Sequence, residues 1–140
     1  MPYPEMLVAP MRQDLVRIGF QELKSADEVD AALGETGEPV LVVVNSVCGC
    51  AAGGMRPAVA LSLRDEKDPR PARLTTVFAG QDVEATTRAR EYFPGYRPSS
   101  PAVALLHEGE VVWMLERHQI EGHHPEMLAS VLKKAYEAHC

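Results

Sequence analysis

The cysteines are the residues of this sequence best suited to covalent chemistry. Cys48 and Cys50 are separated by Gly49, and a third cysteine, Cys140, is the last residue. A cysteine thiolate can attack a disulfide sulfur, and it can also bind a soft metal ion. Because an odd number of cysteines does not suit a framework of structural disulfides, we expect reactive or metal-bound thiols.

The two close cysteines stand between a predicted strand and a predicted helix. Residues 39–45 are apolar and rich in β-branched side chains, which predicts a central parallel strand covered on both faces. After Cys50, apolar residues recur at helical spacing: Ala52, Met55, Val59 and Leu63. Unpaired amides and the dipole at a helix N-terminus stabilise an anion, so we expect Cys48 to be a thiolate with a lowered pKa.

Glycine, proline and arginine mark the start of this predicted helix. Gly49 allows an unusual backbone conformation between the two sulfurs, and Gly53 and Gly54 leave bare backbone where a bulky thiol ligand could approach, although tight packing would explain these glycines equally well. Pro57 cannot donate a helix hydrogen bond, which predicts a bend one turn after the cysteines. Arg56 could add positive potential near the sulfur, but an arginine in the first turns of a helix is usually solvated, and we expect that here.

The remaining pattern completes an α/β domain. Residues 74–79 predict a second strand followed by a helix, and residues 102–106 and 110–115 flank a Gly-containing loop that suits an antiparallel hairpin. A last helix should begin at Pro125. We therefore expect a single α/β domain over residues 1–140, with a central mixed sheet of about four strands and helices on both faces.

Two further helices are expected before this core. The first is indicated by apolar residues at helical spacing: Leu7, Met11, Leu15 and Ile18. Pro10 should start or kink that helix, and Gly19 should end it. Ser25 and Glu28 have the spacing of a capping box, which predicts a short second helix ending near Gly34.

Composition narrows the classes of partner. The 140 residues carry 14 Lys and Arg against 20 Asp and Glu, a net charge of −6, which disfavours binding to nucleic acid or anionic lipid. The longest aliphatic run, residues 40–44, is too short to span a membrane, and the N-terminus lacks the pattern of a secretory signal. We expect a cytoplasmic protein that binds neither nucleic acid nor a membrane.

Several segments together resemble the bacilliredoxin family of the thioredoxin superfamily. They lie at residues 43–53, 56–58, 77–82, 90–93, 98–101, 120–123 and 138–140. That family carries a CGC motif and removes bacillithiol from mixed disulfides on oxidised proteins. The resemblance implies a thioredoxin-like thiol-disulfide oxidoreductase with Cys48 as the attacking thiol and Cys50 as the second thiol. It also implies that Pro101 is a cis proline facing them.

The resemblance also implies the partners and the substrate contacts. Bacillithiol would be a thiol co-substrate and no cofactor would be bound. S-bacillithiolated proteins and a bacillithiol disulfide reductase would be the protein partners. Four residues are expected to contact substrate: Gly49, Gly53, Ser100 and Pro101. Residues two apart on a helix do not face each other, so the mixed disulfide of Cys48 with a small thiol should outlast a Cys48–Cys50 disulfide.

Two other functions remain open from the residues alone. A zinc or iron–sulfur site could use Cys48, Cys50, Cys140 and one of His118, His123 or His124. A noncatalytic adaptor could use three aromatic residues as contacts: Trp113, Tyr92 and Phe93. Nothing in the local sequence activates Cys140, so we favour an exposed spare thiol over a third redox partner.

Overall fold

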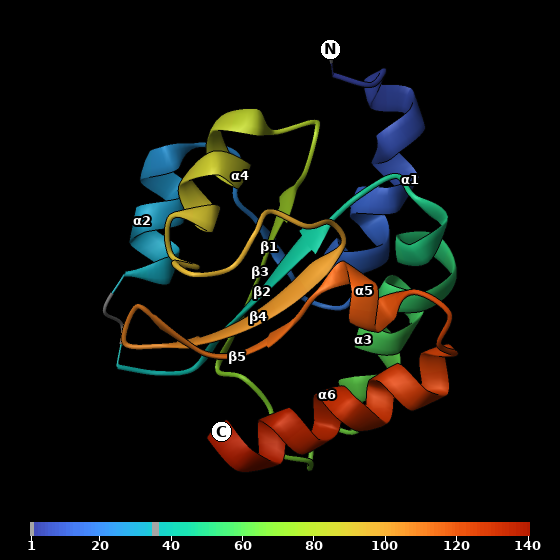
Figure 1. Cartoon of the computed structure of the whole chain (residues 1–140), viewed down its shortest axis with the longest axis vertical. Coiled ribbons are helices and arrows are strands. Elements are labelled where there is room, and N and C mark those ends of the chain that lie inside the picture. The colour runs from blue at the N-terminus through green and yellow to red at the C-terminus, as the bar shows by residue number, and fades with distance from the viewer. Residues whose placement is uncertain (1, 35–36) are drawn as a thin grey trace.

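The computed structural model describes residues 2–34 and 37–140, and a mixed β-sheet forms its centre (Figure 1). The strands are β1 (Gln21–Glu22), β2 (Val40–Asn45), β3 (Arg73–Phe78), β4 (Ala102–His107) and β5 (Glu110–Leu115). The five strands lie in the order β1-β3-β2-β4-β5. β3 runs parallel to β1 and β2, whereas β4 is antiparallel to β2 and β5.

Helices cover both faces of this sheet. They are α1 (Glu5–Val16), α2 (Ala26–Leu33), α3 (Arg56–Ser62), α4 (Val83–Arg90), α5 (Arg117–Ile120) and α6 (Pro125–His139), with a π-helical turn η1 (Ala51–Met55). Figure 1 shows α2 and α4 on one side of the sheet and α1, α3 and α6 on the other. The predicted thioredoxin-like arrangement, with extra N-terminal helices, is confirmed.

Strand β2 separates two hydrophobic cores. All six of its residues are buried. Leu41 and Val43 pack in the core shared with α3 and α6, whereas Val42 and Val44 pack in the core shared with α2 and α4. This alternation arises because successive strand side chains point to opposite faces. The prediction of a central strand covered on both faces is therefore confirmed, and the end of β2 is a rigid base for the residues that follow.

Most of the other predicted elements are also present. Strands β4 and β5 form the predicted antiparallel hairpin, with His107 paired to Glu110 as the last residue of β4, and α6 begins at Pro125. Helix α2 ends before Gly34, and Ser25 caps its start by accepting the amide N–H of Glu28 at 3.2 Å. The two-residue edge strand β1 and the short helix α5 were not predicted, since neither is long enough to produce a periodic pattern.

Helix α1 does not bury the apolar stripe expected from its spacing. Leu7 is exposed, and the buried positions are Val8, Arg12 and Leu15. The reason is Arg12, which is only 7% exposed and forms a bidentate ion pair with Asp82, at 2.7 and 3.1 Å. A buried guanidinium needs carboxylate partners. Because Arg12 must face Asp82, helix α1 is rotated about its axis so that Leu7 faces solvent. Pro10 lies inside α1, which begins at Glu5, so Pro10 does not start the helix.

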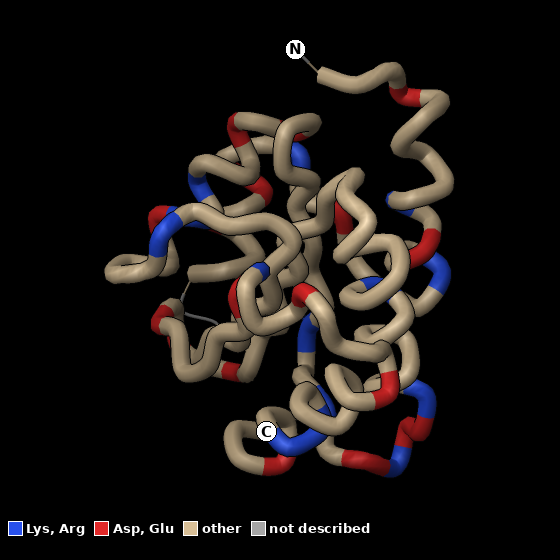
Figure 2. The backbone as a smooth tube through the Cα atoms, turned by 45° about the vertical axis from the view of Figure 1, so that its right-hand side comes forward, with Lys and Arg blue, Asp and Glu red and all other residues tan. Residues whose placement is uncertain are grey.

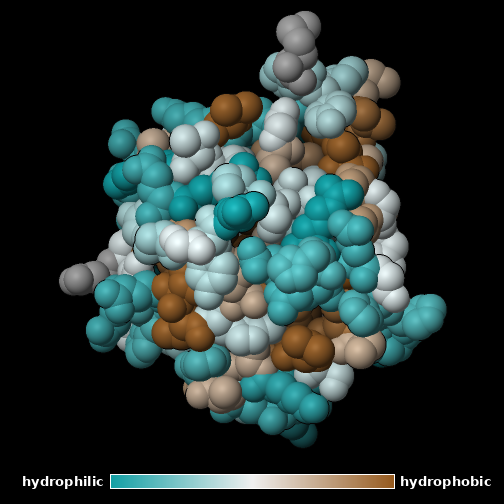
Figure 3. Space-filling view, viewed as in Figure 1, coloured by the Kyte–Doolittle hydropathy of each residue, from teal (hydrophilic) through white to brown (hydrophobic). Residues whose placement is uncertain are grey.

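The surface offers little contiguous apolar area on the face shown. Acidic and basic positions are interspersed along the chain (Figure 2), and the face seen in Figure 1 is mostly hydrophilic with small separate hydrophobic patches (Figure 3). The aromatic residues considered as adaptor contacts belong to the cores instead. Phe93 is buried, and Tyr92 and Trp113 are half-buried against the two hydrophobic cores.

Candidate active site

The two close cysteines lie where β2 passes into the helical segment, as predicted. Gly49 and Cys50 begin that segment, and η1 interrupts its regular hydrogen bonding. Within η1 the amide of Arg56 donates to the carbonyl of Ala51, five residues back. A π turn of this kind accommodates Pro57, which lacks the amide that a regular helix would require.

The π turn also corrects the predicted apolar face of this helix. Met55, Val59 and Leu63 are buried as expected, but Ala52 is exposed and Ala51 is buried in its place. The wider turn rotates the first residues relative to the rest of the helix. Spacing counted at a constant helical period cannot detect this rotation, which turns Arg56 inward.

Cys48 is half-buried and has donors close to its sulfur. The Ser46 hydroxyl lies 3.2 Å from Cys48 Sγ, and the Cys48 amide donates to Ser46 Oγ at 3.3 Å. Burial raises the pKa of the Cys48 thiol, but hydrogen bonds from the Ser46 hydroxyl and the amides of Ala51 and Cys50 outweigh it, so the pKa is lowered. These donors stabilise a thiolate at Cys48.

Cys50 has the opposite electrostatic environment. Burial and then the negative charge of Cys48 raise the pKa of its thiol, and only Arg117 among the neighbouring charges lowers it appreciably. The Cys50 thiol also donates a hydrogen bond to Cys48, which helps to lower the pKa of Cys48. The surroundings therefore favour ionisation of Cys48 before Cys50, and a thiolate is the form that attacks disulfides.

A buried arginine holds the serine beside the sulfur. Arg56 is 5% exposed, and its Nη1 donates to the Ser46 carbonyl and to Asn45 Oδ1, both at 2.9 Å. The same Asn45 oxygen accepts the Ser46 amide at 2.9 Å. The expectation of a solvated Arg56 is therefore wrong, because the π turn directs it under the loop that carries Ser46.

Helix α1 contributes to this network from the other side. Asp14 Oδ2 accepts from Arg56 Nε at 3.2 Å, and Asn45 Nδ2 donates to the Met11 carbonyl at 3.2 Å. The N-terminal helix is thus connected to the Ser46 loop by two polar contacts. Arg56 is fixed by the Asp14 carboxylate, by Asn45 Oδ1 and by the Ser46 carbonyl. These contacts hold the backbone of Ser46 in place.

An open groove of about 310 Å³ runs past Cys48. Ser100 lies in its wall, and the Ser100–Pro101 peptide bond is cis, as the resemblance implied. Pro101 itself is buried, whereas Gly49 and Gly53 are exposed and have open space where a side chain would be. The groove brings Ser100 to Cys48, and the exposed backbone of Gly49 and Gly53 is available to a ligand.

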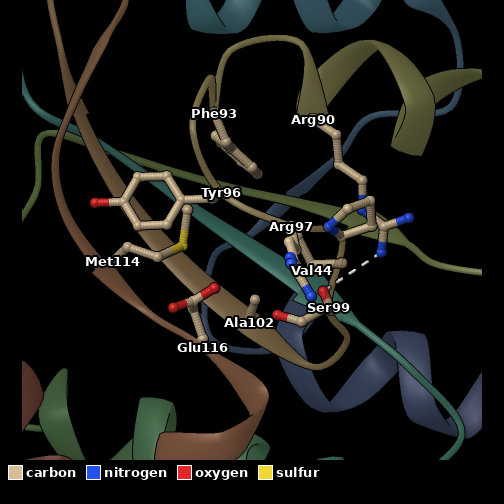
Figure 4. A pocket seen from close by; sticks show the side chains of 10 residues that line it. Val44, Arg90, Phe93, Tyr96, Arg97, Ser99, Ala102, Met114 and Glu116 are labelled. Atoms are coloured by element: carbon tan, nitrogen blue, oxygen red, sulfur yellow. Dashed lines mark hydrogen bonds between the residues drawn. The ribbon is translucent and has the colours of Figure 1, made fainter.

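A second, smaller cavity is lined in part by the loop that precedes Pro101 (Figure 4). Phe93, Tyr96 and Met114 are among the residues that line it. Its interior of about 10 Å³ has room for no more than one water. It therefore is not a substrate site, although Arg90 lines both this cavity and the groove beside Cys48.

The residues considered for a metal site are not brought together. Cys140 ends α6, and Figure 1 places it at the opposite end of the sheet from the Cys48 loop. Within residues 2–34 and 37–140, no group of three or more His, Cys, Asp or Glu side chains is positioned to hold a metal ion. Cys140 is exposed, as expected of a spare thiol, and partial desolvation of its sulfur raises its thiol pKa.

Comparison with known proteins agrees with this geometry. The sequence profile of the disulphide isomerase family matches residues 3–140. A bacilliredoxin from Salinibacter ruber is 52% identical, covering 100% of this chain and 82% of the relative. A bacilliredoxin from Halalkalibacterium halodurans is 52% identical over 96% of this chain and 90% of the relative. This chain belongs to the bacilliredoxin family.

Solved structures agree on the fold of this bacilliredoxin family member. An oxidised thioredoxin from Arabidopsis thaliana superposes with a TM-score of 0.56 at 21% identity, covering 86% of this chain and 96% of that one. A thioredoxin from Malassezia sympodialis gives 0.57 at 15% identity, covering 86% and 90%. With the family assignment, the CGC site makes the protein a thiol-disulfide oxidoreductase.

The resemblance to bacilliredoxins did not single out every residue at the site. Ser46, Arg90 and Arg117 were not predicted, and the role of Arg56 was predicted wrongly. Ser46 has a sequence signal, since a hydroxyl two residues before a cysteine can reach its sulfur. Arg90 and Arg117 have none, because they come from separate elements that only the fold brings to the groove.

No helix in the described part of the chain is long and apolar enough to cross a membrane.

Proposed function

We propose that this protein removes bacillithiol from mixed disulfides on oxidised proteins, with Cys48 as the attacking thiol and Cys50 as the second thiol. The observation that carries the proposal is the Ser46 hydroxyl 3.2 Å from Cys48 Sγ, in a setting where the pKa of Cys48 is lowered and that of Cys50 is raised. The names of the relatives at about 50% identity support bacillithiol as the thiol.

The first proposed step is attack of the Cys48 thiolate on the bacillithiol sulfur of the mixed disulfide. A new bond joins Cys48 to bacillithiol while the old disulfide bond breaks, and the client cysteine leaves as a thiolate that takes a proton from water. The open groove and the exposed backbone of Gly49 and Gly53 give the substrate access, and Ser100 would contact it from the groove wall. Pro101 follows Ser100 but is buried, so its side chain would not be offered to the substrate.

The second proposed step removes bacillithiol from Cys48. If Cys50 attacks Cys48 Sγ, bacillithiol leaves and a Cys48–Cys50 disulfide forms. If a second bacillithiol attacks the bound one, bacillithiol disulfide leaves and Cys48 is regenerated. The electrons then come from bacillithiol, a thiol co-substrate, and a bacillithiol disulfide reductase would restore it. No bound cofactor is needed for either route. The odd number of cysteines suits a reducing, cytoplasmic location.

Intact mass spectrometry after treatment with bacillithiol disulfide tests the roles of the cysteines. A Cys50→Ser, Cys140→Ser variant should gain one bacillithiol adduct on Cys48, because the thiol that could remove it is absent. Cys48→Ser should gain none at the CGC site. An adduct on Cys50 in the wild-type protein, with Cys48 unmodified, would contradict the assignment.

A further inference from the structure

Two arginines line the groove beside Cys48. Arg90 ends α4, and Arg117 begins α5. The groove also includes Ser100 and the loop at Gly80. Positive charge is concentrated here on a chain whose net charge is −6. The two side chains come from elements distant in sequence, and the fold brings both to the sulfur.

Arg90 is a half-buried cation that lacks a carboxylate partner within residues 2–34 and 37–140. Its only hydrogen bond in that part of the chain is from Nη2 to the Ser99 carbonyl at 3.3 Å (Figure 4). A guanidinium has five donors, and removing it from water without a counter-ion is unfavourable. Burial accordingly lowers its pKa. An anion in the groove would satisfy the donors that remain.

Arg117 is exposed but held in place at the edge of the groove. It donates to the Ser100 carbonyl at 3.2 Å and pairs with Glu121 at 2.7 Å. After the Glu121 hydrogen bond, the charges that Cys48 and Cys50 carry when ionised are the largest causes that raise the pKa of Arg117. Its charge therefore acts at both sulfurs, although Glu121 partly neutralises it.

We propose that this groove binds the carboxylate of a small anionic thiol whose sulfur exchanges with Cys48, with Arg90 and Arg117 supplying the positive charge. A guanidinium suits a carboxylate because its paired N–H donors match the two oxygens. The inference rests on the proposed function, because it names Arg90 and Arg117 as the residues that select the charge of the small thiol that exchanges at Cys48. A cationic thiol of the same size would be repelled.

Exchange rates with symmetric disulfides of different charge test this inference. The Cys50→Ser, Cys140→Ser protein is mixed with dithiodipropionate, bis-hydroxyethyl disulfide or cystamine, which carry carboxylate, neutral and ammonium ends. In each case Cys48 attacks one sulfur, forms a mixed disulfide and releases one small thiolate. Rates are followed by mass and divided by those of a free alkyl thiol. The anionic disulfide should react roughly threefold to tenfold faster than the neutral one, and cystamine slowest.

Arginine variants assign the preference to the groove. Arg90→Gln and Arg117→Gln should each reduce the preference for the anionic disulfide, and Arg90→Lys should retain part of it because the charge remains. Arg64→Gln is the matched control, since Arg64 is an exposed arginine outside the groove. It should leave the preference unchanged.

Two results would overturn the inference and are distinguishable. If Cys48 reacts with all three disulfides without charge preference, or if both glutamine variants keep the preference, the groove is not an anion site and the proposed function still stands. If Cys48 reacts with none of the three, the proposed function fails and this inference fails with it.

Discussion

At the scale of single residues, reactivity depends on a difference between two thiols that are two positions apart. Cys48 receives hydrogen bonds from Ser46 and from amides at the helix start, whereas Cys50 loses hydration and lies beside the charge of Cys48. Both effects favour ionisation of Cys48 before Cys50. The serine is the contribution that a single substitution can remove.

Ser46→Ala should make Cys48 a weaker nucleophile at neutral pH. An intramolecular hydrogen bond is worth about 1 kcal/mol, so its loss should lower the thiolate fraction below the pKa by roughly fivefold. The rate of alkylation by iodoacetamide as a function of pH measures this directly, and the inflection should move to higher pH. Ser130→Ala, at an exposed serine on α6, is the control. An unchanged profile for Ser46→Ala would show that the hydroxyl does not stabilise the thiolate.

The two close cysteines should respond differently to substitution by serine. Cys48→Ser should abolish exchange, because the raised pKa of the remaining Cys50 thiol makes it a poor nucleophile at neutral pH. Cys50→Ser should still accept a small thiol, and its release should then depend on the concentration of free thiol. Stopped-flow measurement of thiol release separates the two variants. Equal residual rates would be inconsistent with the proposed roles.

At the scale of elements, α1, the end of β2 and η1 meet around Arg56. The π turn directs this guanidinium inward, where Asn45, Ser46 and Asp14 accept its hydrogen bonds. Arg56 is therefore a positioning residue that acts on Cys48 through Ser46. Its removal should change both the stability of the fold and the ionisation of the thiol.

Arg56→Gln should lower the free energy of unfolding by about 2 to 4 kcal/mol, because buried acceptors lose their donors. Urea denaturation measures this loss, and the alkylation profile of Cys48 should shift in the same direction as in Ser46→Ala. Asp14→Asn is the control, since Asp14 is 42% exposed and should cost less than about 1 kcal/mol. Similar losses in the two variants, with an unchanged thiol profile, would argue against the positioning role.

The elements with strong periodic or β-branched patterns could be predicted from the sequence. Strand β2, the hairpin of β4 and β5, and α6 lie where the pattern indicated, because β2 is buried on both faces and the others have recognisable strand or helix patterns. The face of α1 was wrong because Arg12, a charged residue, is buried by its ion pairs with distant segments. The π turn was missed because a change of helical period leaves no distinct mark in residue spacing.

The site could be predicted only where its residues are adjacent in sequence. Cys48 and Cys50 follow a strand and precede a helix, so their location was available from local pattern. Arg90 and Arg117 are 27 positions apart, and the crossover that brings them to one groove depends on the complete sheet. Long-range charge partners of this kind cannot be obtained from periodicity.

At the scale of the whole molecule, α6 closes the core that lies beneath the active site. Tyr136 is completely buried on α6, and its hydroxyl lies 3.0 Å from Ser62 Oγ on α3. Burial raises the pKa of Tyr136 to about 12. The pairing of these two helices therefore depends on a tyrosine that remains neutral.

Stability should fall in alkaline solution for this reason. In the unfolded chain Tyr136 loses its proton near pH ~10, whereas in the folded protein it keeps the proton until pH is about 12. The contribution of Tyr136 to the free energy of unfolding is fully present below pH ~10. It declines by about 1.4 kcal/mol per pH unit between the pKa of the unfolded chain and that of the folded protein. Urea denaturation across this range should show a smaller decline for Tyr136→Phe. Parallel declines would contradict the linkage.

The most direct test of the central claim is the alkylation rate of each cysteine in the unmodified protein as a function of pH, with the labelled positions assigned by peptide mass spectrometry. Cys48 should be labelled first, with an inflection below the value of about 8.5 for an ordinary thiol. Cys50 and Cys140 should react only at higher pH. Labelling of Cys50 before Cys48, or an ordinary inflection at Cys48, would contradict a thiolate stabilised at the start of the helix.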